Sequence, residues 1–168
     1  MVNPTNINLT DIAADLGAAL KAQGFMLAMA ESCTGGLVAE AITRIAGSSA
    51  WFDRGFITYS NTAKIDMLGV DRKTLDEFGA VSEQTAKEMA IGALKNSASQ
   101  ISGSITGIAG PDGGTQEKPV GMVCFAWAGL DLPVSASTQF FNGNREAIRQ
   151  QAAIYAMAGL IERLNSAA

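Results

Sequence analysis

The sequence contains no histidine in its 168 residues. Histidine moves protons at neutral pH and is a frequent metal ligand, so its absence excludes a Ser-His-Asp triad, a Cys-His pair and every His-ligated metal site. A hydrolytic reaction would have to move protons through lysine, tyrosine, aspartate or glutamate. We expect no catalytic metal, and we expect no cofactor either.

Cysteine, long apolar runs and clustered basic charge are also scarce. Cys33 and Cys124 form no disulfide framework, and residues 1–10 lack the basic start and apolar run of a secretory signal, so we expect a cytoplasmic protein. No segment has the apolar length that spans a bilayer. The twelve lysines and arginines are scattered along a chain of net charge −4, which disfavours nucleic-acid binding. A small molecule is the expected partner.

The composition is that of one globular unit. Hydrophobic residues make up 48% of the chain and charged residues 17%, and a chain of this length can bury one well-filled core. We find no internal repeat and no linker. We therefore expect one domain over residues 1–168, with its core at about 10–164.

Hydrophobic periodicity and turn residues predict an alternation of helices and strands. The first helix begins at Thr10, a short helix is capped by Asn61, and Asp71 is a further candidate cap. The predicted helices cover 10–23, 35–47, 61–69, 82–95 and the chain from 144, and the predicted strands cover 25–30, 54–60, 101–107, 119–129 and 133–141. This order indicates an α/β sandwich with a mixed sheet flanked by helices, its early strands parallel and its later strands joined by hairpins.

The first candidate site is the segment 31–36 (ESCTGG), where a buried strand leads into a helix. Ligands of α/β sheets bind beyond the carboxyl ends of the strands, and a helix start offers free N–H groups to an anion or oxyanion. Gly35 and Gly36 let a ligand approach the backbone closely. The segment also fits a purely structural role, in which Ser32 or Thr34 caps the helix and the glycines form a turn.

The second candidate is the segment 59–64 (YSNTAK), another strand end that leads into a helix. Most lysines are solvated surface charges, but a lysine in a first helical turn opposes the macrodipole, and a nearby helix start would help to keep its amine neutral. A neutral Lys64 can act as the base of a Ser-Lys pair, which Ser32 would need in a protein without histidine. Cys33 is an alternative nucleophile, although only a helix terminus and distant cations would lower the pKa of its thiol.

The third candidate is the glycine-rich loop 106–115, which contains Thr106, Gly107 and Gly110. Two strands can be joined with far fewer residues, and such loops form backbone cradles for phosphates or carbonyl oxygens. The alternative is a roomy hairpin turn. The fourth candidate is Arg145 in the first turn of the last helix, where an anionic ligand would compensate an unfavourable charge and where a solvated arginine is the alternative.

These residues carry a family resemblance. The segments AESCTGGLVAEAIT (30–43), GFITYSNTAKIDMLGV (55–70), FGAVSEQTAKEMA (78–90) and TGIAGPDGG with KPVGMV (106–123) resemble the CinA C-terminal domain family, whose enzymatic members deamidate nicotinamide mononucleotide. The resemblance implies hydrolysis to nicotinate mononucleotide and ammonia, in NAD salvage, by a Ser/Lys dyad made of Ser32 and Lys64. It covers residues from about 10 to 164. The larger N-terminal domain of full-length members is missing from this sequence, so we do not expect its pyrophosphatase activity.

The resemblance and the residues together predict a mechanism. Ser32 would attack the carboxamide and Lys64 would take its proton, while N–H groups at Thr34, Gly35 or Gly36 hold the oxyanion. Tyr59 would pack on the pyridinium ring, beside further predicted substrate-binding residues: Glu31, Ser60, Asn61, Thr106, Gly107, Gly110 and Arg145. A non-catalytic nucleotide-binding module and a cysteine hydrolase using Cys33 are the alternatives. We also expect a homo-oligomer, because thin single-sheet domains with an apolar final helix commonly self-associate.

Overall fold

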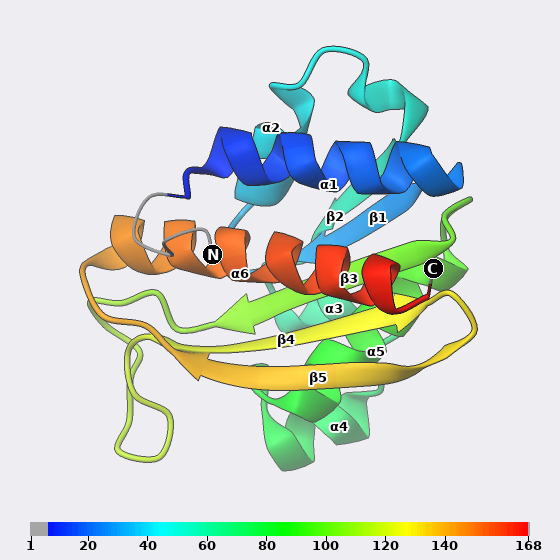
Figure 1. The fold of residues 1–168 in the computed structure, drawn as a ribbon. Helices are drawn as coiled ribbons and strands as arrows, with labels where there is room; N and C mark the ends of the chain where they lie inside the picture. Colours follow the sequence, from blue (N-terminus) through cyan, green and yellow to red (C-terminus); the bar gives the residue numbers. More distant parts are fainter. Residues whose placement is uncertain (1–6, 168) are drawn as a thin grey trace.

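A mixed five-stranded sheet lies at the centre of the computed structural model, which describes residues 7–167 (Figure 1). The strands are β1 (Leu27–Glu31), β2 (Phe52–Ile57), β3 (Ile101–Gly107), β4 (Met122–Gly129) and β5 (Leu132–Phe140), in the order β2-β1-β3-β4-β5. β1 pairs in parallel with β2 and β3, whereas β3–β4 and β4–β5 are antiparallel. The predicted fold class, a mixed sheet flanked by helices, is confirmed.

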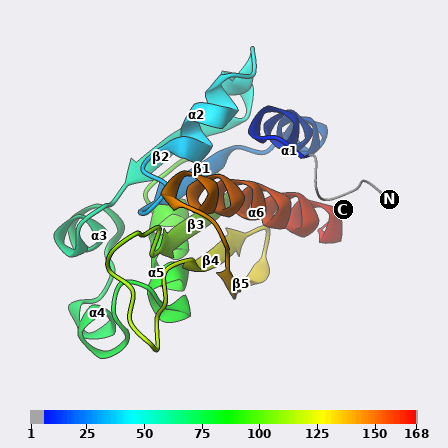
Figure 2. The same ribbon diagram turned by 90° about the vertical axis from the view of Figure 1, so that its left-hand side faces the viewer.

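Helices cover both faces of the sheet (Figures 1 and 2). α1 (Leu9–Gln23), α2 (Leu37–Thr43) and α6 (Arg145–Ser166) lie on one face, and α3 (Asn61–Leu68), α4 (Arg72–Phe78) and α5 (Glu83–Lys95) lie on the other. A short 3₁₀ helix, η2 (Ser48–Ala50), precedes β2. All five residues of β1 are buried, as expected for a strand covered on both faces.

The two layers of the core differ in side-chain size. The α1, α2 and α6 side contains the larger cluster, with Leu16, Met29 and Phe125 among its buried residues. On the other side, small residues let α5 lie close to the sheet, and the Ser102 and Ser104 hydroxyls of β3 each donate to an α5 carbonyl oxygen at 2.6 Å. Hydrogen bonds to buried backbone oxygens hold α5 in a fixed position on β3.

Several predicted boundaries are wrong for identifiable reasons. α2 starts at Leu37 because Gly35 and Gly36 have φ of 58° and 103°, which places them in a turn. The caps of α1 and α3 are Asn8 and Ser60, one or two residues before the predicted starts. β4 begins only at Met122. The predicted cap Asp71 is confirmed, and the helix that it caps is α4, for which no range was predicted. Across residues 7–167, none of the helices combines the length and the apolar character that membrane crossing requires.

Candidate functional site

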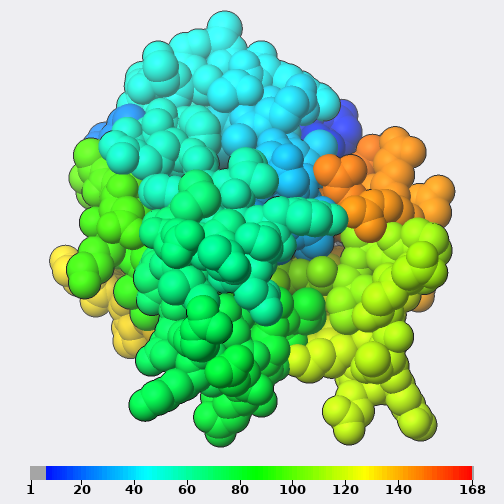
Figure 3. Space-filling view, turned by 180° about the vertical axis from the view of Figure 1, so that it is seen from behind, coloured from blue at the N-terminus to red at the C-terminus, as the bar shows by residue number. Residues whose placement is uncertain are grey.

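The topology brings four chain segments to one edge of the sheet. β1, β2 and β3 run in the same direction, so the residues that follow each of them meet where these strands end. β5 also runs in this direction, because it is separated from β3 by one antiparallel strand, and α6 therefore begins at the same edge. Figure 3 shows the segment around residue 60, the loop 108–121 and the start of α6 gathered on one face of the molecule.

Ser32 is the first residue after β1. Its N–H donates to the carbonyl oxygen of Ile105 at 3.0 Å, which continues the pairing of β1 with β3, and its own carbonyl accepts from the N–H of Gly35 at 3.0 Å. The chain therefore turns sharply at Ser32, whose side chain is 7% exposed. The Ser32 hydroxyl is held at the carboxyl edge of the sheet by backbone hydrogen bonds on both sides.

Lys64 reaches Ser32 from α3. Its Nζ lies 2.9 Å from Ser32 Oγ and donates to the carbonyl oxygen of Thr58 at 2.8 Å, with that of Tyr59 at 3.5 Å. The side chain is only 1% exposed. A neutral amine has two N–H groups and one lone pair; with the carbonyl oxygens as acceptors for the N–H groups, the lone pair is left for the Ser32 proton.

Burial lowers the pKa of Lys64. Desolvation lowers the pKa of its ammonium group below the ordinary value of 10.5, and the Cys33 thiol opposes this shift only in part. The acceptors around Nζ are a hydroxyl and two carbonyl oxygens, so none of them adds a negative charge that would restore the pKa. The amine is thus made available as a base.

Cys33 points to the same cavity but lacks the properties of a nucleophile. Its side chain is buried, and burial raises the pKa of the thiol to about 12. The reactive form of cysteine is the thiolate, which is negligible at neutral pH with such a pKa. The structure therefore argues against the cysteine alternative and for Ser32.

A cavity of about 260 Å³ opens beside the Ser32–Lys64 pair. It brings together the following predicted site residues: Ser32, Tyr59, Lys64, Thr106, Gly107, Gly110 and Arg145. Arg145 crosses its mouth, donating to the Gly110 carbonyl oxygen at 2.7 Å and to the Tyr59 hydroxyl at 3.2 Å. Thr106 is anchored by its hydroxyl, which donates to the Ala80 carbonyl oxygen at 2.8 Å. Asp112, which belongs to the predicted loop 106–115 but was not singled out as a binding residue, also lines the cavity.

Other predicted binding residues lie outside this lining: Glu31, Thr34, Gly35, Gly36, Ser60 and Asn61. Glu31 is fully buried, and its carboxylate accepts the N–H groups of Val38 and Ala39 at 3.0 and 3.1 Å, so it caps α2. Ser60 caps α3 through the N–H of Ala63. The N–H of Gly35 is already bonded to Ser32 and is not free for an oxyanion, which corrects that part of the predicted mechanism.

The sequence analysis missed Arg149. Its guanidinium donates to the carbonyl oxygens of Cys33 at 3.1 Å and Thr34 at 2.9 Å, from α6 to the turn that follows Ser32. The only available signal was its position four residues after Arg145, which places both arginines on one face of a helix.

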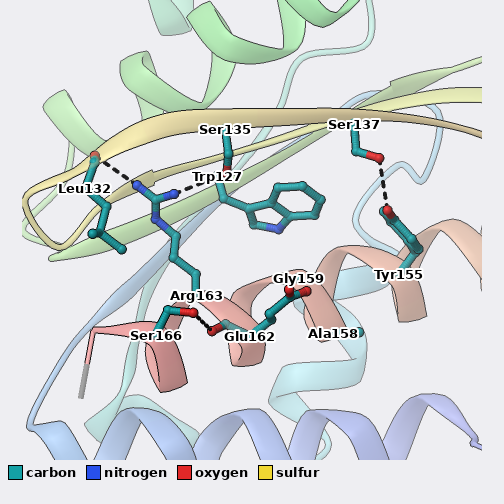
Figure 4. A pocket seen from close by; sticks show the side chains of 10 residues that line it. All are labelled: Trp127, Leu132, Ser135, Ser137, Tyr155, Ala158, Gly159, Glu162, Arg163 and Ser166. Carbon is teal, nitrogen blue, oxygen red and sulfur yellow. Dashed lines mark hydrogen bonds between the residues drawn. The ribbon is translucent and has the colours of Figure 1, made fainter.

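A second cavity, of about 410 Å³, lies between β5 and α6 (Figure 4). Two charged residues, Glu162 and Arg163, line it. Arg163 already donates to Ser135 Oγ and to the Leu132 carbonyl oxygen, and the Ser137 and Tyr155 hydroxyls bond to each other. The hydrogen bonds of the Arg163 guanidinium therefore link α6 to the β4–β5 hairpin. This cavity is larger than the one at Ser32, but it offers no comparable nucleophile and base.

A serine hydroxyl beside a buried lysine amine is an arrangement that serine hydrolases without a catalytic histidine use. Residues 9–164 match the model of the CinA C-terminal domain. The chain is 56% identical to a nicotinamide-nucleotide amidohydrolase PncC of Enterobacter agglomerans (89% of this chain, 91% of that protein) and 53% identical to the PncC of Escherichia coli K12 (93% and 94%). A solved structure of the competence/damage inducible protein CihA from Agrobacterium tumefaciens superposes with a TM-score of 0.90 at 46% identity, over 95% of this chain and 97% of that one. The chain therefore belongs to the CinA C-terminal domain family.

Proposed function

We propose that this protein hydrolyses the carboxamide of nicotinamide mononucleotide to nicotinate mononucleotide and ammonia, as a step of NAD salvage. The observation that carries the proposal is the 2.9 Å contact between Ser32 Oγ and the buried amine of Lys64. The names of relatives that match along nearly their whole length supply the substrate.

The reaction divides between the two side chains. Neutral Lys64 takes the hydroxyl proton as Ser32 Oγ attacks the carboxamide carbon. The protonated Lys64 then gives this proton to the amide nitrogen of the tetrahedral intermediate, and the C–N bond breaks to release ammonia. The nicotinoyl ester on Ser32 is then attacked by water, whose proton passes to Lys64 and on to the leaving Ser32 oxygen. Backbone N–H groups of the turn after Ser32 stabilise the oxyanion of both tetrahedral intermediates.

The shape of the site indicates how the nucleotide lies. The cavity of about 260 Å³ is at the small end of ligand sites, so we place the pyridine ring and ribose inside it and the phosphate at its mouth. Arg145 is the cation at the mouth, and Tyr59, 63% exposed, offers its ring to the positively charged pyridinium. Thr106 and the loop from Gly107 to Gly110 face the ribose.

Ammonia release from nicotinamide mononucleotide, nicotinamide riboside and free nicotinamide tests the proposed function directly. We expect efficient release from the mononucleotide and much weaker release from the two compounds without phosphate. Tight binding of the mononucleotide without ammonia release would instead identify a nucleotide-binding module.

Arg145→Ala tests the phosphate contact. Loss of a charge-assisted hydrogen bond costs about 1.5–3 kcal/mol, so we expect KM for the mononucleotide to rise about 10- to 100-fold with a smaller change in kcat. Nicotinamide riboside is the matched control substrate, and its KM should change little. An equal loss with both substrates would mean that Arg145 supports the fold of the site and does not bind phosphate.

Activity is expected to be indifferent to chelators. Within residues 7–167 no cluster of three acidic or sulfur side chains is arranged to hold a metal ion, and the proposed base needs no Lewis acid. The check is ammonia release before and after treatment with EDTA, followed by Zn²⁺ or Mg²⁺. Activity that is lost on chelation and restored by either ion would contradict a metal-independent Ser-Lys mechanism.

A further inference from the structure

Arg149 connects the last helix to the turn that carries the nucleophile. It lies one helical turn after Arg145 in α6, and its Nε and Nη2 donate to two successive carbonyl oxygens, those of Cys33 and Thr34. The planar guanidinium presents donors in a fixed fork, so one side chain fixes the orientation of two consecutive peptide groups.

This contact determines where neighbouring N–H groups point. A trans peptide group carries its C=O and N–H on opposite sides, so a Cys33 carbonyl directed at Arg149 turns the Thr34 N–H away from α6. In the same way, the Ser32 carbonyl faces the Gly35 N–H inside the turn and directs the Cys33 N–H outward. In the part of the chain that the structure describes, the N–H groups of Cys33 and Thr34 donate to no oxygen atom. Two unpaired donors thus directly follow Ser32.

We propose that Arg149 is a positioning residue for amide hydrolysis: it holds the turn from Ser32 to Gly35 so that two N–H groups are pre-organised as the oxyanion hole, that of Cys33 in the cavity lining and that of Thr34 directly behind the lining. This inference rests on the proposed function. The guanidinium also polarises the peptide group between Cys33 and Thr34, which strengthens the Thr34 N–H as a donor. Pre-aligned donors lower the energy of the transition state without a reorganisation cost during the reaction.

A purely structural role for Arg149 is the alternative. α6 has independent anchors, since Ile148, Ala152, Ala156 and Leu160 are all buried in the main core cluster. Arg149 itself is only half-buried. Removing its side chain should therefore leave α6 in place while it releases the turn.

The test compares Arg149→Met and Arg149→Lys with the wild type, and Arg72→Met serves as the matched control on an exposed arginine of α4. Loss of aligned oxyanion donors typically lowers kcat about 10²- to 10³-fold, and we expect this for Arg149→Met with KM nearly unchanged. Lysine keeps the positive charge but lacks the fixed pair of N–H donors of a guanidinium. The kcat of Arg149→Lys should therefore lie between those of Arg149→Met and the wild type. A rise in KM at constant kcat, or a loss of kcat matched by a large fall in Tm, would overturn the proposal.

A second measurement separates this inference from the identity of the substrate. A fluorophosphonate phosphonylates an activated serine: the serine oxygen bonds to phosphorus, fluoride leaves, and the hydroxyl proton passes to the base. Its P=O oxygen needs the same donors as the carboxamide oxygen. The rate of labelling is measured from the mass of the intact protein. We expect Ser32 to be labelled more slowly in Arg149→Met than in the wild type, even if nicotinamide mononucleotide is not hydrolysed. Equal labelling rates would overturn the role of Arg149 alone, whereas a wild-type protein that neither takes the label nor releases ammonia would overturn both proposals.

Discussion

Ser32→Ala is expected to lower kcat for ammonia release by about 10⁴-fold or more, because it removes the atom that forms the covalent intermediate. The protein should remain folded, since the hydroxyl makes one side-chain hydrogen bond and its loss changes the free energy of unfolding by about 1 kcal/mol. Binding of nicotinamide mononucleotide, measured by calorimetry, should persist. A variant with a tenth of the wild-type kcat, a difference of about 1.4 kcal/mol in the barrier, would exclude Ser32 as the nucleophile.

Cys33→Ala is the matched control for Ser32→Ala, because the two side chains are adjacent and both line the cavity. The alanine variant should keep most of its activity, since the Cys33 thiol is protonated and serves only as packing. Loss of activity in Cys33→Ala together with retention of activity in Ser32→Ala would support Cys33 as the nucleophile.

The second large effect concerns Lys64. Lys64→Arg should be as inactive as Lys64→Met, about 10³-fold or more below the wild type, because a guanidinium stays protonated at any usable pH and cannot accept the serine proton. In the wild type, kcat should rise with pH as Lys64 loses its proton, with an apparent pKa below 10.5. If arginine restored most of the rate, the lysine would act only as a positive charge, and Tyr59 or Glu31 would have to be examined as the base.

The same pKa shift affects stability in a defined direction. The pKa of Lys64 is lower in the folded than in the unfolded protein, so the unfolded chain binds more protons between the two values and the folded state gains stability as pH rises through that window. Lys64→Met removes this dependence. The difference in Tm between Lys64→Met and the wild type should therefore shift in favour of the wild type as pH rises toward 10.5, and a constant difference would show that Lys64 is not perturbed by burial.

The contact between Ser32 and Lys64 could be anticipated from the absence of histidine, from the position of both residues after predicted strands and from the family resemblance. Ser32 and Lys64 each follow a buried or half-buried strand, and parallel strands bring such positions to one edge. The positive φ values of Gly35 and Gly36 could not be predicted from the amino-acid sequence, since glycine is compatible with a helix start as well as with a turn. The predicted α2 was consequently too long.

The contacts that Glu31 and Arg149 make with the backbone could not be predicted from the sequence, for a different reason. Glu31 looked like a ligand-binding carboxylate because it precedes Ser32, yet its oxygens are used by the first N–H groups of α2. Arg149 binds carbonyl oxygens more than a hundred positions earlier in the chain, and backbone acceptors leave no residue-type signature. Contacts between a side chain and a distant part of the backbone depend on tertiary structure, unlike the local contacts of a helix cap.

The way in which Lys64 is held has a consequence for engineering. The oxygens that accept its N–H groups belong to the main chain at Thr58 and Tyr59, so changes of the side chain at position 59 leave those oxygens where they are. The Tyr59 ring meanwhile stands exposed at the entrance of the cavity. Position 59 is therefore a place to diversify in a library that seeks amidases for other cationic or neutral heteroaromatic amides, because substrate preference can change there while the base keeps its alignment.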